Sequence, residues 1–304
     1  MNFTPLTIVG LRQKPKYLLL GIVVCLVSLH LYLIWKISFR LDVESPVRNA
    51  GSELLSISLL FWATALSLLW QKRHTLRLES GVFSSFLGAS LIALVFFKSI
   101  SLSSDDPFLH ISPLISALGL GIFASGIKGL KQYWQQLLIL LVLAIPMEAV
   151  LAKLVDLDTL TAQFANFVLV QLGFDAFRQG TVVGLPTGAV RVDPGCSGVR
   201  AITRLLQLSV LILVMVPTGW IAKIIVPAMA ILLAFVINSI RVAVLTLLIA
   251  NSHRKAFDFW HEGTGSHAIS IVSVLVLWLF CQFLIRQDEP GNGQGNSGSP
   301  RSGD

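Results

Sequence analysis

Charged residues are scarce in this chain of 304 residues. Asp, Glu, Lys and Arg together make up only 13% of the sequence, whereas 54% of it is hydrophobic. This composition excludes a soluble globular domain, and the length excludes a protein with only one or two membrane spans, so a polytopic membrane protein is predicted. The formal net charge is +7. Because the basic residues are scattered through short connections, no nucleic-acid partner is predicted.

Cysteine is also rare. The chain has three cysteines, and two of them, Cys25 and Cys281, fall inside apolar runs, where we expect them to be packing residues. The sequence therefore has no disulfide framework, and Cys196 is left as an odd thiol outside those runs.

Long apolar runs predict an all-α polytopic membrane fold, with the lipid bilayer as its surroundings. About eight transmembrane helices are predicted, at residues 17–36, 54–70, 82–101, 111–127, 134–152, 199–217, 221–249 and 266–285. The long interruption at 153–198 is predicted to hold an amphipathic helix at 159–172 and a short hairpin at 180–192.

The distribution of motifs divides the sequence into three parts. Residues 1–133 hold N-terminal membrane helices, residues 134–285 form a membrane core with the candidate site, and residues 286–304 form a Gly- and Ser-rich tail that is predicted to be disordered.

The basic connections predict the topology. The positive-inside rule places them in the cytoplasm, so the N-terminus is inside and the 153–198 and 250–265 segments face the extracytoplasmic side of a cell inner (plasma) membrane. The residues concerned are Arg12, Lys14, Lys16, Lys72, Arg73, Arg77, Lys128 and Lys131.

Cys196 follows a Pro-Gly turn signal and comes directly before an apolar run, so its thiol is expected at the start of a membrane helix. Helix N-terminal N–H groups, together with Arg200 and Arg204 one and two turns into the helix, favour a thiolate. The alternative is that Cys196 is a small buried hydrophobic residue. Asp193, three residues earlier, is interpreted as a turn residue.

Two charges fall within predicted spans. Arg241 interrupts the apolar run from Val226 to Ala250, and a guanidinium there is suited to bind an oxyanion or a carboxylate. A structural salt bridge or snorkelling to a headgroup is the alternative. Glu148, after Pro146, is expected either to pair with an arginine or to cap a broken helix.

Three of the six histidines, His253, His261 and His267, lie in the outer connection before the last span. Histidine can transfer a proton to a leaving amine, and we prefer His261 for its aromatic and glycine-rich setting. A zinc site is the rival interpretation. A His-Glu-x-x-His motif would need histidine at Gly265, so neither a metal site nor another cofactor is predicted.

In combination, these motifs resemble those of the exosortase/archaeosortase family of membrane cysteine transpeptidases. The motifs are Cys196-Ser197-Gly198-Val199-Arg200, Asn238-Ser239-Ile240-Arg241 and a histidine-glycine element before the final span. The resemblance covers roughly residues 134–285. The segment from Phe259 to Ser266 is most similar to the cyanobacterial branch, the cyanoexosortases.

The resemblance implies a substrate class and a mechanism. Substrates would be secreted proteins that end in a Pro-Glu-Pro-like (PEP-CTERM) motif, a hydrophobic span and a basic end. Cys196 would form a thioester with the protein near that motif, Arg241 would stabilise the oxyanion, and His261 would protonate the departing amine. The family's third position varies between histidine and arginine. Arg200 and Arg204 are candidates to bind the motif's carboxylate, as are Arg178 and Arg191 unless these two are ordinary loop charges.

Other functions are compatible with the composition. A polytopic transporter would explain the spans and the buried Arg241, although no internal repeat or paired broken helix is present. A non-catalytic scaffold for envelope assembly is a third hypothesis. The sequence leaves open the acyl acceptor, which is a lipid, sugar, amine or water, and the participation of an accessory membrane subunit.

Overall fold

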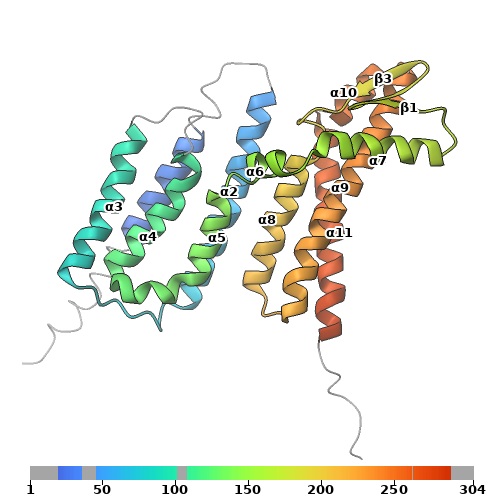
Figure 1. Ribbon diagram of the computed structural model, residues 1–304. Coiled ribbons are helices and arrows are strands. Elements are labelled where there is room, and N and C mark those ends of the chain that lie inside the picture. Colours follow the sequence, from blue (N-terminus) through green and yellow to red (C-terminus); the bar gives the residue numbers. More distant parts are fainter. Residues whose placement is uncertain (1–19, 36–45, 101–107, 262, 289–304) are drawn as a thin grey trace, which may run out of the picture. The chain divides into compact units, whose positions relative to one another are not determined.

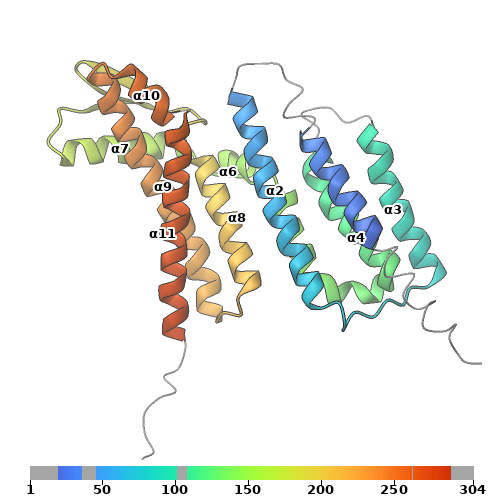
Figure 2. The same cartoon turned by 180° about the vertical axis from the view of Figure 1, so that it is seen from behind.

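The computed structural model describes residues 20–35, 46–100, 108–261 and 263–288. Most of the predicted tail at 286–304 lies outside this part of the chain. The protein is mostly helical and divides into two compact units (Figures 1 and 2). The first unit comprises residues 1–151 with 210–215, and the second comprises residues 152–209 with 216–304.

The first unit is built from helices. In chain order they are Leu20–Trp35, α2 (Pro46–Gln71), α3 (Val82–Ile100), α4 (Phe108–Gly129), η1 (Leu130–Tyr133), α5 (Trp134–Ala144) and most of α6 (Met147–Leu154). The α3 and α4 backbones are in direct contact. A Cβ atom added at Gly88 would lie 2.5 Å from the backbone nitrogen of Phe123, so only glycine fits at this crossing.

The predicted span at 134–152 is interrupted. Helix α5 ends at Ala144, Ile145 is extended, and α6 begins only after Pro146. Proline lacks the N–H that would continue the helix and disfavours a helical conformation in the residue before it. With its 11 residues, α5 is about 16 Å long, which is shorter than the hydrocarbon core of a bilayer.

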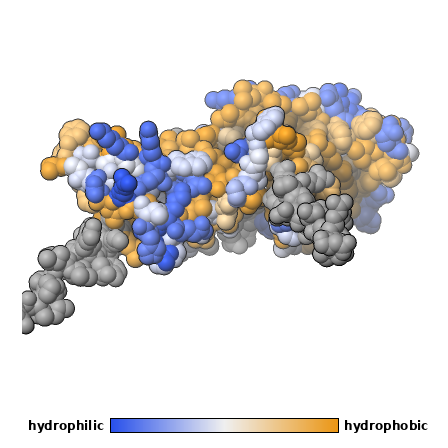
Figure 3. Space-filling model, turned by 90° about the horizontal axis from the view of Figure 1, so that it is seen from below, coloured by the Kyte–Doolittle hydropathy of each residue, from blue (hydrophilic) through white to orange (hydrophobic). Residues whose placement is uncertain are grey.

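Four stretches in the described part of the chain are long and apolar enough to cross a membrane. They are Val82–Ile100, His110–Ala144, Trp220–Ala250 and Thr264–Leu284, and Leu20–Trp35 and Ser56–Gln71 are shorter apolar helices. Many large hydrophobic side chains on these helices are exposed, among them Phe97 and Trp278. Figure 3 shows hydrophobic side chains over much of the visible surface. Such a surface is stable against lipid, so the chain is a membrane protein with several apolar helices.

The second unit combines helices with a small sheet. Its elements are α7 (Leu157–Gln171), β1 (Phe177–Gln179), β2 (Val182–Leu185), β3 (Gly188–Arg191), α8 (Val199–Met215), α9 (Trp220–Ala250), α10 (Arg254–His261) and α11 (Thr264–Asp288). The last six residues of α8 belong to the first unit. Helix α7 runs crosswise to α9 and α11, near the end of α9 where the sheet and α10 also lie (Figures 1 and 2).

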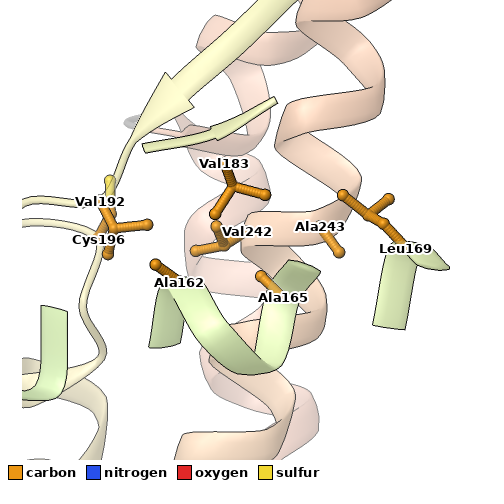
Figure 4. Close-up of a cluster of buried hydrophobic side chains, with 8 residues drawn as sticks. All are labelled: Ala162, Ala165, Leu169, Val183, Val192, Cys196, Val242 and Ala243. Carbon is orange, nitrogen blue, oxygen red and sulfur yellow. The ribbon is translucent and has the colours of Figure 1, made fainter. Parts of the chain in front are cut away.

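The three strands are antiparallel in the order β1-β2-β3. Period-two alternation turns Val183, Val190 and Val192 inward, where each is at most 7% exposed. A buried cluster forms between the sheet, α7 and α9, and Cys196 lies beside Val192 at the margin of this cluster (Figure 4). Its members are Ala162, Ala165, Leu169, Val183, Val192, Cys196, Val242 and Ala243.

Candidate functional site

Cys196 stands on a tight turn between β3 and α8. The Asp193 carboxylate accepts hydrogen bonds from the backbone N–H of Gly195 at 2.9 Å and of Cys196 at 3.1 Å. The Asp193 carbonyl accepts two more, from the N–H of Cys196 at 2.9 Å and of Ser197 at 2.8 Å. Aspartate stabilises turns in this way because its short side chain reaches the backbone two and three residues on. The prediction that Asp193 is a turn residue is confirmed.

Gly198 completes the turn before α8 starts at Val199. Its φ is +87°, a left-handed conformation that residues with a Cβ rarely adopt. A Cβ at this position would also lie 2.8 Å from Nδ2 of Asn238. Both reasons require glycine here, two residues after the thiol.

The structure brings Cys196 and His261 together from segments 65 residues apart. The Cys196 Sγ atom lies 2.7 Å from the His261 Nε2 atom. Cys196 is only 2% exposed, and His261 at the end of α10 is half-buried. A thiol and an imidazole at hydrogen-bond distance can exchange a proton, which is the requirement for an activated cysteine nucleophile.

The imidazole is oriented by its own helix. The His261 ring stacks on Phe257, one turn earlier in α10, with ring centroids 4.9 Å apart and planes at 16°. Side chains four residues apart lie on the same face of a helix, so this contact follows from the spacing. It limits the directions in which Nε2 can point.

Arg241, on α9, binds the C-terminal end of α10. Its Nη2 donates to the His261 carbonyl at 2.5 Å and its Nε donates to the Trp260 carbonyl at 3.3 Å. Carbonyl groups at a helix C-terminus lack helical partners and carry partial negative charge, so a cation is favoured there. The Arg241 guanidinium thus fixes the position of the His261 backbone, and the His261 imidazole contacts the Cys196 thiol.

Asn238 connects Arg241 to the cysteine turn. Its Nδ2 donates to the Cys196 carbonyl at 2.7 Å, and its Oδ1 accepts from Arg241 Nη1 at 3.4 Å. Asn238 lies three residues before Arg241, so the two side chains share a face of α9. Cys196, Asn238, Arg241 and His261 therefore form one connected polar group.

Thr161 supports the same turn from α7. Its hydroxyl donates to the Ser197 carbonyl at 2.8 Å, and the side chain is fully buried. Sequence reasoning missed this residue, because a threonine on an amphipathic helix carries no distinctive pattern. Asn238 was present in a recognised motif but without a role, and its spacing from a charged residue inside an apolar run was the available signal.

The two predicted substrate-binding arginines lie in the first two turns of α8. Arg200 and Arg204 are both half-buried. Arg200 lies within electrostatic range of Arg241, as does Cys196. Arg241 therefore is the positive charge that lies near both the Cys196 thiol and the first turn of α8.

The remaining candidates lie in other settings. His267, in the first turn of α11, and His253, before α10, are both exposed. Arg178 donates to the Gly180 carbonyl within its own hairpin at 2.7 Å. Glu148 is exposed in the first turn of α6, in the first unit, where His110 lies within its electrostatic range. Among the described residues, no cluster of three or more His, Cys, Asp or Glu side chains is arranged to hold a metal ion.

The sequence matches the family model of the transmembrane exosortases (Exosortase_EpsH) over residues 47–278. Comparison with curated proteins and with solved structures gave no match. The family match covers most of the chain, extends into both units, and contains Cys196, Arg241 and His261. The chain therefore belongs to the transmembrane exosortase family, whose members are in general cysteine transpeptidases that act in the membrane on secreted proteins with a sorting signal.

Proposed function

We propose that this protein is a cysteine transpeptidase or peptidase that removes a C-terminal sorting signal from secreted proteins through a thioester on Cys196. The observation that supports this most directly is the 2.7 Å separation of Cys196 Sγ and His261 Nε2. A thiol beside an imidazole, with an arginine bound at the same site, is an arrangement suited to acyl transfer.

In the first half of the reaction, His261 Nε2 takes the thiol proton and Sγ attacks the carbonyl carbon of the scissile peptide bond. An S–C bond forms, and the negative charge moves to the carbonyl oxygen. The guanidinium of Arg241 carries more N–H donors than the three used in its contacts with Asn238, Trp260 and His261, so it can also donate to this oxyanion. The C–N bond then breaks as the His261 imidazolium protonates the departing amine.

In the second half, an acceptor amine, hydroxyl or water attacks the thioester. His261 removes the proton of this nucleophile, the S–C bond breaks, and the thiolate of Cys196 recovers a proton. Arg241 again faces the oxyanion. An amine or hydroxyl on a lipid or sugar of the cell envelope gives transpeptidation, and water gives hydrolysis through the same groups.

The proposed substrates carry a PEP-CTERM-type signal, with a Pro-Glu-Pro-like motif before a hydrophobic span. Arg200 and Arg204 are assigned to the motif's carboxylate, because both lie half-buried in the first two turns of α8, the helix that follows the Cys196 turn. The segment Phe259 to Ser266 supports assignment to the cyanoexosortase branch. The hypothesis also includes an accessory membrane subunit among the partners.

The proposed location is the cell inner (plasma) membrane, with eight spans and the site on the extracytoplasmic side. The distribution of basic connections supports this orientation. The sheet and α10 lie at the same end of α9 (Figure 1), and Cys196 lies on the turn that follows β3, so one side of the membrane would hold the whole site.

Cys196→Ala tests the proposal directly. The variant and the wild type are each co-expressed with a secreted protein that carries the sorting signal, and the mass of the target's C-terminus is measured. We expect the variant to accumulate at wild-type level and to leave the signal uncleaved. Cys281→Ala is the matched control, because Cys281 is also buried but lies in α11 among apolar residues. Continued cleavage by Cys196→Ala would contradict the proposal.

A further inference from the structure

Strand β3 forms one edge of the three-stranded sheet, and its backbone groups alternate in direction. The Val192 N–H donates to the Thr181 carbonyl at 2.9 Å, and this pair continues the β2–β3 register one residue beyond the Val182–Arg191 pair. Directly opposed residues in antiparallel strands alternate between hydrogen-bonded and non-bonded pairs. The backbone N–H and C=O groups therefore point toward β2 at Gly188, Val190 and Val192. At Ala189 and Arg191 the same groups point away from the sheet.

This outer edge is accessible. Ala189 and Arg191 are both exposed, whereas Val190 and Val192 between and beyond them are buried. In the described part of the chain, β3 has a strand neighbour on one side only, which is β2. Two residues of a strand span about 6.6 Å, so the edge presents donor and acceptor groups at the spacing that another strand requires.

Of the two edge strands of the sheet, β3 is the one that leads along the chain to Cys196. The strand leads through Val192 directly into the Asp193–Cys196 turn, in which the Cys196 N–H donates to the Asp193 carbonyl. It also packs tightly on α9, since a Cβ at Gly188 would lie 3.0 Å from Ile249 and 3.1 Å from Ala250. The strand is therefore held between the helix of Arg241 and the turn of Cys196.

We propose that an extended segment of the substrate, next to the scissile bond, adds to the outer edge of β3 as a fourth strand. The N–H and C=O groups of this segment bond those of Ala189 and Arg191, and the chain then continues across the turn that holds Cys196. The assignment rests on the proposed function, because it places the peptide that Cys196 attacks. The Arg191 side chain lies on the exposed face of the strand, where it can bind an acidic side chain of that segment.

Chemistry favours this mode of binding. A protease must hold its substrate extended, because the scissile carbonyl is then open to the nucleophile, and an extended chain has unpaired main-chain groups on both sides. Addition to a sheet edge satisfies one side and leaves the reacting bond at the end of the new strand. Main-chain pairing is also independent of side chains, so it suits an enzyme that processes several proteins.

The first test uses the wild-type protein and a fluorescence-quenched peptide that spans the cleaved bond. Each non-proline peptide bond upstream or downstream of that bond is replaced in turn by an ester, which removes one N–H. We expect kcat/KM to fall at least about fivefold at every second position and to change little between them, because one side of an added strand faces β3. Equal sensitivity at neighbouring positions, or no sensitivity, would overturn the proposal.

The second test changes the edge itself. Ala189→Pro removes an outward N–H and leaves the β2–β3 ladder complete, and proline is tolerated on edge strands. We expect KM to rise at least about fivefold with the rate of alkylation of Cys196 by iodoacetamide unchanged. Arg178→Pro is the control on the opposite edge, because the Arg178 N–H faces outward there, and Arg178→Ala measures separately the loss of the side chain that donates to the Gly180 carbonyl. We expect the KM of Arg178→Pro to equal that of Arg178→Ala. Wild-type KM in Ala189→Pro, or equal effects at both edges, would contradict the proposal.

These outcomes are separable from a failure of the proposed function. If Cys196→Ala still cleaves the peptide, the thioester mechanism is wrong whatever the ester series shows. If only wild-type Cys196 cleaves and the ester series shows no alternation, the mechanism stands and the strand addition is wrong.

Discussion

Helices α3 and α9 are both long and apolar enough to cross a membrane, but two polar side chains of α9 also bind groups outside their own helix. In α3, the hydroxyl groups of Ser90 and Ser99 donate to carbonyls one turn back in the same helix, at 2.9 and 2.6 Å. In α9, Asn238 and Arg241 donate to carbonyls of Cys196, Trp260 and His261, which belong to other segments. The first pattern satisfies a polar group locally, whereas the second ties three segments into one site.

The difference has an energetic basis. A serine in an apolar helix needs no external partner, because its own helix offers a carbonyl within reach. An asparagine or arginine side chain is longer, has more donors, and is costly in lipid unless another segment accepts its hydrogen bonds. Residues of the second kind are therefore informative about tertiary contacts and function, and those of the first kind are not.

The largest predicted effect on turnover is at His261, whose backbone is bound by Arg241 of α9. His261→Ala should lower turnover about 10²- to 10⁴-fold, because it removes the group that moves the proton of Cys196. His267→Ala should have little effect, since His267 is exposed in α11. The measurement is the cleavage rate of a co-expressed or purified target by each variant. The opposite ranking would mean that His267 is the acid–base group.

Arg241→Lys is expected to lower turnover about 10²-fold and to leave substrate binding mostly unchanged. Lysine keeps the charge but cannot bind the Trp260 and His261 carbonyls and an oxyanion together. In α3, Lys98→Arg is the matched control and should change neither kcat nor KM. Unchanged kcat in Arg241→Lys would remove Arg241 from both the positioning and the oxyanion role.

Asn238→Ala should lower the free energy of unfolding by about 1–3 kcal/mol, because the buried Cys196 carbonyl loses its side-chain donor. Ser239→Ala, at the adjacent position, should have a smaller effect, since the Ser239 hydroxyl bonds the Phe235 carbonyl within α9. Thermal unfolding in detergent compares the two variants. Equal effects would show that the contact between segments adds no stability beyond a contact within one helix.

The smallest expected effect is a pH dependence of the stability of the first turn of α7, the helix that carries Thr161. The hydroxyl and backbone N–H of Thr159 lower the pKa of the Asp156 carboxyl, which caps the helix. A lowered native pKa stabilises the cap above the unfolded pKa of about 3.9, and this stabilisation is lost as the pH falls through the native pKa. The protection factors for hydrogen exchange of the first α7 amides should therefore fall at acid pH in the wild type. Asp156→Asn should remove this pH dependence, and an unchanged profile in that variant would assign it to another group.

Part of the site is readable from the sequence because its residues are unusual where they occur. An arginine inside an apolar run, a cysteine after a Pro-Gly turn and a histidine before a span are each conspicuous, so Arg241, Cys196 and His261 were named from the sequence. The mechanism that the resemblance implies requires Cys196 and His261 to lie together, and in the structure their side chains are at hydrogen-bond distance. The roles of the residues remain predictions.

Other features were hidden from sequence reasoning. Thr161 looks like an ordinary member of an amphipathic helix and Phe257 like an ordinary aromatic residue of the outer connection, and only their contacts with Ser197 and His261 distinguish them. The break at Pro146 was visible as a proline, but apolar residues on both sides suggested a continuous span. The eight-span arrangement likewise remains a prediction, because length and apolarity alone identify four stretches of the described chain as able to cross a membrane.

The sequence by itself determined that this chain is a membrane protein and which few polar residues lie within its apolar runs. Apolar composition and isolated charges can be read from the sequence because they are local properties. Only the tertiary structure decided which carbonyl each donor reaches. Arg241 was expected to serve a developing oxyanion, yet it also binds the end of α10, and Asn238 links it to the cysteine turn. Such partners lie 19 to 42 residues away along the chain, and no periodic pattern encodes a hydrogen bond between separate segments.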